Sequence, residues 1–222
     1  MIVWLASYPR SGNTLLRIIL RNCFDVWSYG DVATSGTGDP EFSNLGGLLH
    51  YSGERGALIS RLRGTSGFHF VKTHAETPEP KDRAIYVVRD GRAAVHSYQR
   101  FLRDLENLDF TLEQISVGWP LAMTWAQHVS NWIDNPNVLF LRFEDLTAEG
   151  CPPLEAISKF IDRPILRPFE IAFSDLNKIR PQYFGVGRNA PGIERVECEA
   201  GDTFWRANGE MMSRLGYEKR SS

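Results

Sequence analysis

A short polar segment near the start of the chain has the residue types that bind an oxyanion. The segment Ser7-Tyr8-Pro9-Arg10-Ser11-Gly12-Asn13-Thr14 separates an apolar run over residues 2–7 from a helical pattern over residues 13–24. A helix start offers unpaired backbone N–H groups and the positive end of the helix dipole. Gly12 allows close backbone approach, and the side-chain donors are Arg10, Ser11, Asn13 and Thr14. The segment predicts a phosphate or sulfate site, and the alternative is an ordinary capped helix after a turn.

A second segment carries a candidate acid–base group. Lys72-Thr73-His74 follows a short strand candidate over residues 68–72. An imidazole titrates near neutral pH, so it suits removal of a proton from a hydroxyl group. The chain has five histidines. We favour His74 because it follows a strand and has a lysine two residues earlier.

A third segment joins a strand to a helix. Residues 84–89 form the strongest strand candidate, a run of apolar residues that ends in Arg89. Ligands of open α/β sheets bind beyond the carboxyl ends of strands, so Arg89 is placed to reach an anion. Ser97 lies eight residues further on, in a helical pattern over residues 93–103. The alternatives are a surface ion pair for Arg89 and a solvent-facing helical position for Ser97.

The remaining patterns indicate the elements that position these segments. Further helices are expected at residues 54–63, after the capping box Thr111–Gln114, along the stripe Trp125, Val129 and Trp132, from Pro152 to Ile161, and at residues 203–215; a further strand is expected at residues 138–143. Residues 28–47 read as a long loop, and residues 177–202 show no clear period. Strands that alternate with helices predict a single α/β domain over residues 1–222, with a mainly parallel sheet flanked by helices.

Composition narrows the class of protein. The chain has 222 residues and a formal net charge of −2, which argues against general affinity for nucleic acid or an anionic membrane. It has three cysteines without a CxxC pair, which favours free thiols over a disulfide framework or a zinc site. The sequence shows no signal peptide, no apolar run of 18 residues and no cluster of metal ligands. We therefore expect a cytoplasmic protein that uses no metal.

The three segments together resemble the sulfotransferases that use 3′-phosphoadenosine 5′-phosphosulfate (PAPS). The first resembles the family's 5′-phosphosulfate loop, which commonly reads Tyr-Pro-Lys-Ser-Gly-Thr-Thr-Trp; here Arg10, Asn13 and Leu15 replace lysine, threonine and tryptophan. The second resembles the segment with the family's catalytic histidine. The third resembles the 3′-phosphate segment, in which an arginine and a serine eight residues later bind the phosphate. Leu141 to Leu146 resembles the family's Tyr-Glu-Asp segment.

The resemblance implies a P-loop nucleotide-kinase-like fold and specific residue roles. His74 is the implied base, and Lys72 and Arg10 stabilise charge on the transferring sulfuryl group. Arg89 and Ser97 bind the 3′-phosphate of PAPS and of the product, adenosine 3′,5′-bisphosphate (PAP). Arg188 is the favoured C-terminal ligand of that phosphate, with Arg180 and Arg195 as rivals. Phe173 is a candidate to stack on adenine, with plain core packing as the alternative.

The acceptor and two competing functions stay open. The resemblance implies a hydroxyl, with an amine as second choice, on a small-molecule or carrier-bound acceptor that meets Phe101, Trp119 or Tyr183. A P-loop kinase shares the strand–loop–helix geometry, but its GxxxxGK[ST] pattern is absent. A non-catalytic nucleotide-binding protein is the third possibility. The sequence does not indicate an oligomeric state.

Overall fold

The strands pair into one parallel sheet. The computed structural model describes residues 1–30, 40–77, 81–148, 152–179 and 190–219. In this part of the chain the strands are β1 (Ile2–Ala6), β2 (Ser28–Tyr29), β3 (Leu48–Leu49), β4 (His69–Thr73), β5 (Arg83–Val88) and β6 (Val138–Arg142). Their order is β3-β2-β4-β1-β5-β6, and every pair is parallel. The predicted α/β fold with a mainly parallel sheet is confirmed.

The apolar runs become the centre of the sheet because both of their faces are covered. All five residues of β1 are buried, and β5 is buried from Ala84 to Val88. Alternate residues contribute to different clusters: Trp4 packs on one side of the sheet, and Val3 and Leu5 pack on the other. Burial on both faces is typical of parallel strands and explains why these runs lack alternating polar residues.

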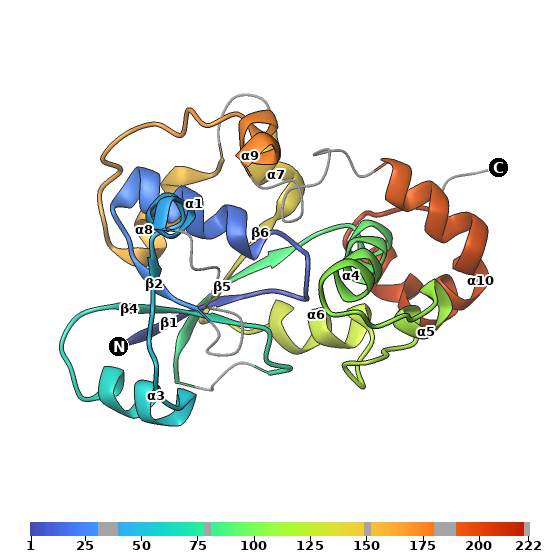
Figure 1. Cartoon of the computed structure of the whole chain (residues 1–222), viewed down its shortest axis with the longest axis horizontal. Helices are drawn as coiled ribbons and strands as arrows, with labels where there is room; N and C mark the ends of the chain where they lie inside the picture. The colour runs from blue at the N-terminus through green and yellow to red at the C-terminus, as the bar shows by residue number, and fades with distance from the viewer. Residues whose placement is uncertain (31–39, 78–80, 149–151, 180–189, 220–222) are drawn as a thin grey trace.

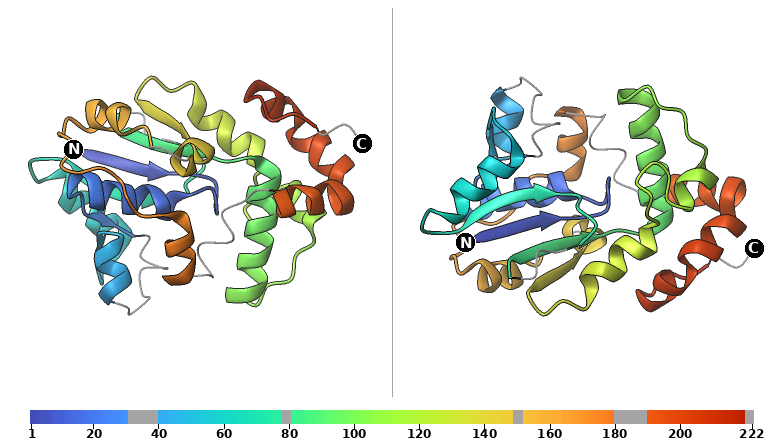
Figure 2. Two further views of the ribbon diagram at one scale, coloured as in Figure 1. Left: turned by 90° about the horizontal axis from the view of Figure 1, so that it is seen from above. Right: turned by 90° about the horizontal axis from the view of Figure 1, so that it is seen from below.

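Helices cover the two faces (Figure 1). They are α1 (Asn13–Phe24), α2 (Pro40–Leu45), α3 (Arg55–Arg63), α4 (Gly91–Leu105), α5 (Leu112–Ser116), α6 (Trp125–Ile133), α7 (Phe143–Thr147), α8 (Leu154–Ile161), α9 (Phe173–Ile179) and α10 (Ala190–Arg214). Buried residues of α1, α2, α7, α8 and α9 share the cluster of Val3 and Leu5. Those of α3, α4, α5, α6 and α10 share the cluster of Trp4. Figure 2 shows α4, α5 and α10 grouped at the end of the molecule away from the N-terminus.

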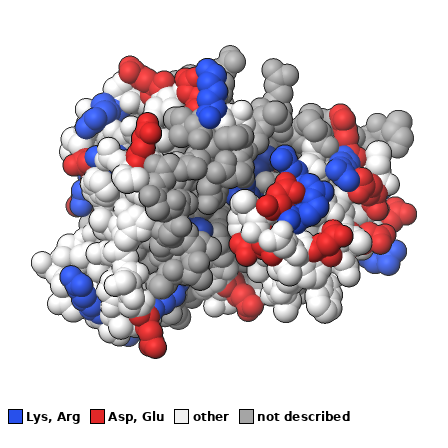
Figure 3. All heavy atoms as spheres, viewed as in Figure 1, with Lys and Arg blue, Asp and Glu red and all other residues white. Residues whose placement is uncertain are grey.

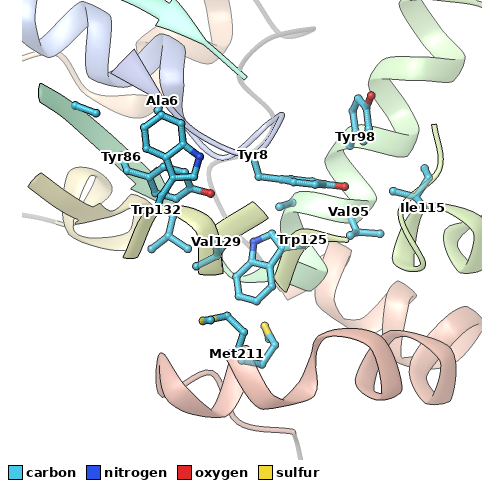
Figure 4. Close-up of a cluster of buried hydrophobic side chains, with 14 of the residues drawn as sticks. Ala6, Tyr8, Tyr86, Val95, Tyr98, Ile115, Trp125, Val129, Trp132 and Met211 are labelled. Carbon is cyan, nitrogen blue, oxygen red and sulfur yellow. The ribbon is translucent and has the colours of Figure 1, made fainter. Parts of the chain in front are cut away.

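The cluster of Trp4 is built around aromatic rings (Figure 4). Trp125 and Trp132 are fully buried on α6, as the predicted stripe required. Tyr86 of β5 packs against Trp132, with ring centroids 5.5 Å apart. Large buried rings contribute much of the apolar area that stabilises a core. Tyr8, in the loop that follows β1, belongs to this cluster, so the core also supports that loop.

Two expectations about irregular segments were wrong. Residues 28–47 contain β2 and α2, and residues 31–39 lie outside the described residues. Residues 177–202, which showed no clear period, contain the end of α9 and the first part of α10, whose backbone departs from helical angles at Ala200; the helix expected at residues 203–215 is confirmed as the part of α10 after this kink. Residues 180–189 lie outside the described residues. Tertiary packing explains both errors: Phe42 of α2 and Val196 of α10 are buried, and burial overrides a weak local pattern.

Charged side chains are mixed over the surface. Figure 3 shows Lys and Arg beside Asp and Glu on the described part of one face. Exposed ion pairs such as Arg195–Glu199 and Arg214–Asp134 are examples of this mixing. Among the described helices, none is long and apolar enough to cross a membrane. The described residues also hold no group of three or more histidine, cysteine or acidic side chains arranged to bind a metal ion.

Candidate active site

Three strand ends meet where the predicted segments begin. Ala6 of β1 is in register with Thr73 of β4 on one side and with Tyr86 of β5 on the other. The loop that starts at Ser7 therefore lies between His74 and Arg89. The parallel order of β4, β1 and β5 thus brings together segments that are far apart in the sequence.

The first loop turns tightly onto the start of α1. Arg10 and Gly12 have φ angles of 65° and 111°. The Asn13 amide donates a hydrogen bond to the Leu5 carbonyl at 2.7 Å, which ties the helix start to β1. Asn13 is thus used to hold the loop, and its predicted contact with an anion stays a prediction. Thr14 lies half-buried in the first turn of α1.

The loop has polar groups without acceptors. The Ser11 side chain is fully buried, and its hydroxyl has no hydrogen-bond partner among the described residues. The cap residue of α1 is Gly12, which provides no side-chain hydrogen bond to the first turn. A buried hydroxyl without a partner costs roughly 1–3 kcal/mol. An oxyanion in this loop would accept from these groups, so the geometry fits the predicted ligand.

Gly12 is needed for conformation and for space. A Cβ added there would lie 2.6 Å from Cδ2 of Phe143. We expect Gly12→Ala to lower the free energy of unfolding by about 1–3 kcal/mol, through strain at positive φ, and to weaken PAP binding about 10-fold. Gly67→Ala is the matched control, because Gly67 has a φ of 90° with nothing near its missing Cβ. Urea unfolding and PAP titration check this; equal PAP affinity in both variants would contradict it.

His74 is held in one tautomer. Its Nδ1–H donates to the Ser7 carbonyl oxygen at 2.7 Å. The lone pair therefore lies on Nε2, the atom that can accept a proton. Burial, followed by the nearby charge of Lys72, lowers the pKa of His74 to about 3. The imidazole is thus neutral at neutral pH. Lys72 precedes it on β4 and is half-buried.

Arg10, Arg89 and Ser97 come together beside the loop. The Arg89 guanidinium donates to the Arg10 carbonyl at 3.2 Å. The Arg10 Nε donates to the Ser97 hydroxyl at 3.4 Å. The Arg10 guanidinium also lies 5.3 Å from the ring centroid of Phe101. Spacing alone did not show that Ser97 reaches Arg89, whereas the structure places both against Arg10.

The Glu144 carboxylate, to which the sequence analysis assigned no role, lies near Arg89. Glu144 accepts hydrogen bonds from the Asp90 N–H at 3.1 Å and from the Tyr217 hydroxyl at 2.8 Å. Burial lowers the pKa of Arg89 to about 10, and the charges of Glu144 and Asp90 oppose this shift. Arg89 therefore keeps its charge at neutral pH. The signal for Glu144 was available, since it follows β6 at the carboxyl edge of the sheet.

The structure describes only some of the C-terminal residues that we expect to bind the nucleotide. Arg188 and Arg180 lie outside the described residues. Arg195 is exposed on α10 and forms an ion pair with Glu199 at 2.7 Å. Phe173 is the first residue of α9, and its side chain is not among those described. The roles of these four residues stay predictions.

A buried histidine of α6 lies beside the His74 turn. His128 of α6 is 2% exposed and accepts a hydrogen bond from the Tyr86 hydroxyl at Nδ1, at 2.8 Å. Burial lowers the pKa of His128 to about 4. We did not identify it from the sequence, although a histidine on the core-facing stripe of Trp125 and Trp132 was a usable signal.

The low pKa values of His74 and His128 predict that the folded state loses stability at low pH. A folded-state pKa below the unfolded value of about 6.5 means that the unfolded chain binds protons first, so stability is lost as pH falls below about 6.5. For His128, a change from pH 7 to pH 5 costs about 2 kcal/mol. Urea unfolding at both pH values checks this in the wild type and in His128→Gln. The same pH dependence in both proteins would contradict the assignment to His128.

Comparisons with known proteins identify the family of the chain. The family described as "Sulfotransferase domain" matches residues 2–178. Sulfotransferase 1A1 of Canis lupus familiaris is 27% identical over 177 residues, which cover 72% of this chain and 59% of that protein. Flavonol 3-sulfotransferase of Flaveria bidentis is 22% identical over 179 residues, covering 73% of this chain and 57% of that protein. This chain thus spans less than two thirds of the length of these relatives.

Solved structures share the fold. Mouse sulfotransferase SULT7A1 complexed with PAP has a TM-score of 0.60 and 18% identity, covering 98% of this chain and 89% of that chain. Retinol dehydratase in complex with androsterone and inactive cofactor PAP has a TM-score of 0.61 and 16% identity, covering 100% of this chain and 82% of that chain. The structural match supports the predicted P-loop-like α/β fold. Because the family match covers well over half of its residues, this chain belongs to the sulfotransferase domain family.

Proposed function

We propose that the protein transfers a sulfuryl group from PAPS to a hydroxyl group. The observation that carries the proposal is the meeting of Arg10, His74, Arg89 and Ser97 at one edge of the sheet. A neutral base and two guanidinium groups suit a reaction between an anionic donor and a hydroxyl group. We also propose that residues 1–222 act as one domain, since α10 shares a core cluster with α4, α5 and α6.

The described residues fit the donor at both of its ends. The buried Ser11 hydroxyl and the first turn of α1 would hold the 5′-phosphosulfate. Arg89 and Ser97 would hold the 3′-phosphate, with Arg188 as a further ligand. A guanidinium group matches phosphate oxygens in geometry and in charge. When bound, PAPS supplies the sulfuryl group that passes from a phosphate oxygen to the acceptor oxygen.

The chain's own groups would move the proton and stabilise charge. Nε2 of His74 takes the proton from the acceptor hydroxyl while that oxygen bonds to sulfur and the bond from sulfur to the phosphate oxygen breaks. Lys72 and Arg10 stabilise negative charge on the sulfuryl oxygens and on the departing phosphate. Fixed charges that face developing charge supply much of the rate enhancement in such transfers. The negative charge of a bound anion also offsets the positive charges of Lys72 and Arg10. This raises the pKa of the His74 imidazole toward its usual range.

The acceptor is proposed as a small molecule, free or carrier-bound, with an amine as second choice. Phe101 lies beside Arg10, and Trp119 is 60% exposed with its ring 6.4 Å from that of Phe110. The aromatic ring of Phe101 beside Arg10 favours an acceptor with apolar parts. Retinol dehydratase was solved with androsterone, and another relative is named for a flavonol, so aromatic and steroid alcohols are the first acceptors to test.

Ligand-dependent unfolding separates the competing functions. At 100 times its dissociation constant, PAP should stabilise the folded chain by about 2.7 kcal/mol. ATP with magnesium should stabilise it less. Incubation with sulfur-labelled PAPS and a panel of phenols and steroid alcohols should give a labelled product. Stronger stabilisation by ATP with magnesium would point to a kinase, and PAP binding without label transfer to any acceptor would point to a non-catalytic protein.

A further inference from the structure

The turn that carries His74 rests on α6 through polar contacts. The Nε2 atom of His128 lies 3.5 Å from the His74 carbonyl oxygen. One helical turn further on, the Asn131 amide donates to the Glu76 carbonyl at 3.1 Å. The Ala75 N–H donates to the Thr73 hydroxyl at 3.0 Å. Helix α6 and β4 together therefore hold the main chain on both sides of the candidate base.

Tyr86 fixes the orientation of the His128 ring. Burial raises the pKa of Tyr86, so its hydroxyl keeps its proton and donates to Nδ1 of His128. The low pKa of His128 keeps that ring neutral. A neutral imidazole that accepts at Nδ1 carries its proton on Nε2, which faces the His74 carbonyl. The His74 carbonyl oxygen can only accept, so the tautomer with its proton on Nε2 is the one that satisfies both that carbonyl and Tyr86.

The surroundings leave the His128 ring little freedom to reorient. Its ring centroid lies 5.7 Å from those of Tyr8 and Tyr86. Figure 4 shows Tyr8 and Tyr86 in one cluster of buried side chains with Trp132 and Val129. Tyr8 belongs to the loop over residues 7–12 between β1 and α1, which we call the anion loop, and its ring is buried. The ring of His128 therefore contacts both the His74 turn and the loop that binds the donor in our proposal.

We propose that His128, fixed by Tyr86, is a positioning residue that holds the His74 turn so that Nε2 of His74 faces the reacting hydroxyl. The inference rests on the proposed role of His74 as the base. His74 is then held twice, by the Ser7 carbonyl at Nδ1 and by His128 at its own carbonyl. Small errors in the position of a catalytic group are costly, since a shift of about 1 Å can lower a rate about 100-fold.

The test uses a pair of substitutions that removes the polar contact and keeps the core apolar. In the double variant Tyr86→Phe/His128→Phe both partners of the Tyr86–His128 hydrogen bond are replaced by rings, so neither side chain is left with an unpaired polar atom, and the His74 carbonyl loses its contact with His128. We expect it to fold, to bind PAP within about 2-fold of the wild type, and to lose about 10-fold or more in kcat with PAPS and 2-naphthol. The matched control is Ile133→Val, a mild substitution at the end of the same helix, with kcat within about 2-fold of the wild type.

A spectroscopic measurement tests the same inference without an acceptor. In ¹⁵N-histidine NMR, the wild type should show His74 mainly as the Nδ1–H tautomer. The double variant should show a mixture of tautomers, because its His74 turn is no longer held. A folded double variant with wild-type kcat and a wild-type His74 spectrum would overturn the proposal.

Conservative variants cover the case in which the double variant fails to fold. Glutamine places its amide nitrogen near the position of Nε2, whereas asparagine reaches only to that of Nδ1. His128→Gln should therefore retain most of the kcat and the His74 tautomer, and His128→Asn should lose both; equal behaviour of the two would overturn the proposal. If the wild type transfers no label from PAPS, the proposed function fails, and the NMR comparison still decides whether His128 positions His74.

Discussion

Replacing His74 by alanine should lower the rate of the proposed sulfuryl transfer by about 100-fold to 10,000-fold, the usual range for loss of a general base. This loss is expected because His74 carries its lone pair on Nε2, where it can accept a proton, and because its ring is neutral at neutral pH. PAP affinity should stay within a few-fold of the wild type, because the anion loop, Arg89 and Ser97 are unchanged. Label transfer from PAPS and calorimetric titration with PAP measure the two quantities.

His74→Asn is the matched control for this variant. The asparagine amide can still donate to the Ser7 carbonyl, so the loop keeps its hydrogen bond, but no group remains at the position of Nε2. We expect His74→Asn to be as slow as the alanine variant and closer to the wild type in stability. Near-normal turnover in either variant, with an acceptor that the wild type uses, would remove His74 from the mechanism.

Replacing Arg89 by alanine should weaken PAP binding by about 10-fold to 100-fold, the equivalent of a charge-assisted hydrogen bond of roughly 1.5–3 kcal/mol. Arg89 stays charged at neutral pH, lies 4.5 Å from the ring centroid of Phe143, and donates to the Arg10 carbonyl. Calorimetric titration with PAP gives the affinity.

Adenosine 5′-monophosphate makes this prediction specific, because it lacks the 3′-phosphate. Its affinity should change by no more than about 3-fold in the Arg89→Ala variant, so the variant loses the preference for PAP. Arg89→Lys keeps the charge but not the planar donor geometry, and its PAP affinity should lie between those of the wild type and Arg89→Ala. An equal loss of affinity for both nucleotides would show that Arg89 supports the loop and does not recognise the 3′-phosphate.

The main elements could be predicted because their signals are local. The apolar runs of β1 and β5, the capping box that starts α5 and the stripe of α6 depend on neighbouring residues, and the structure confirms each of them. The wrong expectations concern segments whose structure depends on distant partners. α2 is stabilised by Phe42, which packs with the cluster of Val3 and Leu5, and no local pattern reveals that contact.

The residues of the candidate site divide in the same way: some have a local sequence signal, and the role of others depends on contacts with distant parts of the chain. The loop, His74 and Arg89 are recognisable because each follows a strand and carries a reactive residue type. The contact between Arg10 and Ser97 and the support of Arg89 by Glu144 join different parts of the chain. Their residue types are ordinary on a protein surface, and only the packing of α4, β6 and α7 gives them a role.

The parallel register that joins β4, β1 and β5 also has a consequence for how the protein folds. The contact between His74 and Ser7 links residues 67 positions apart, and that between Arg89 and Arg10 links residues 79 positions apart. Closing such large loops costs chain entropy before the contacts that stabilise them exist, and non-local pairings of this kind slow folding. The candidate site therefore has no local precursor, and its residues come together only when the central sheet forms and separate when the sheet unfolds.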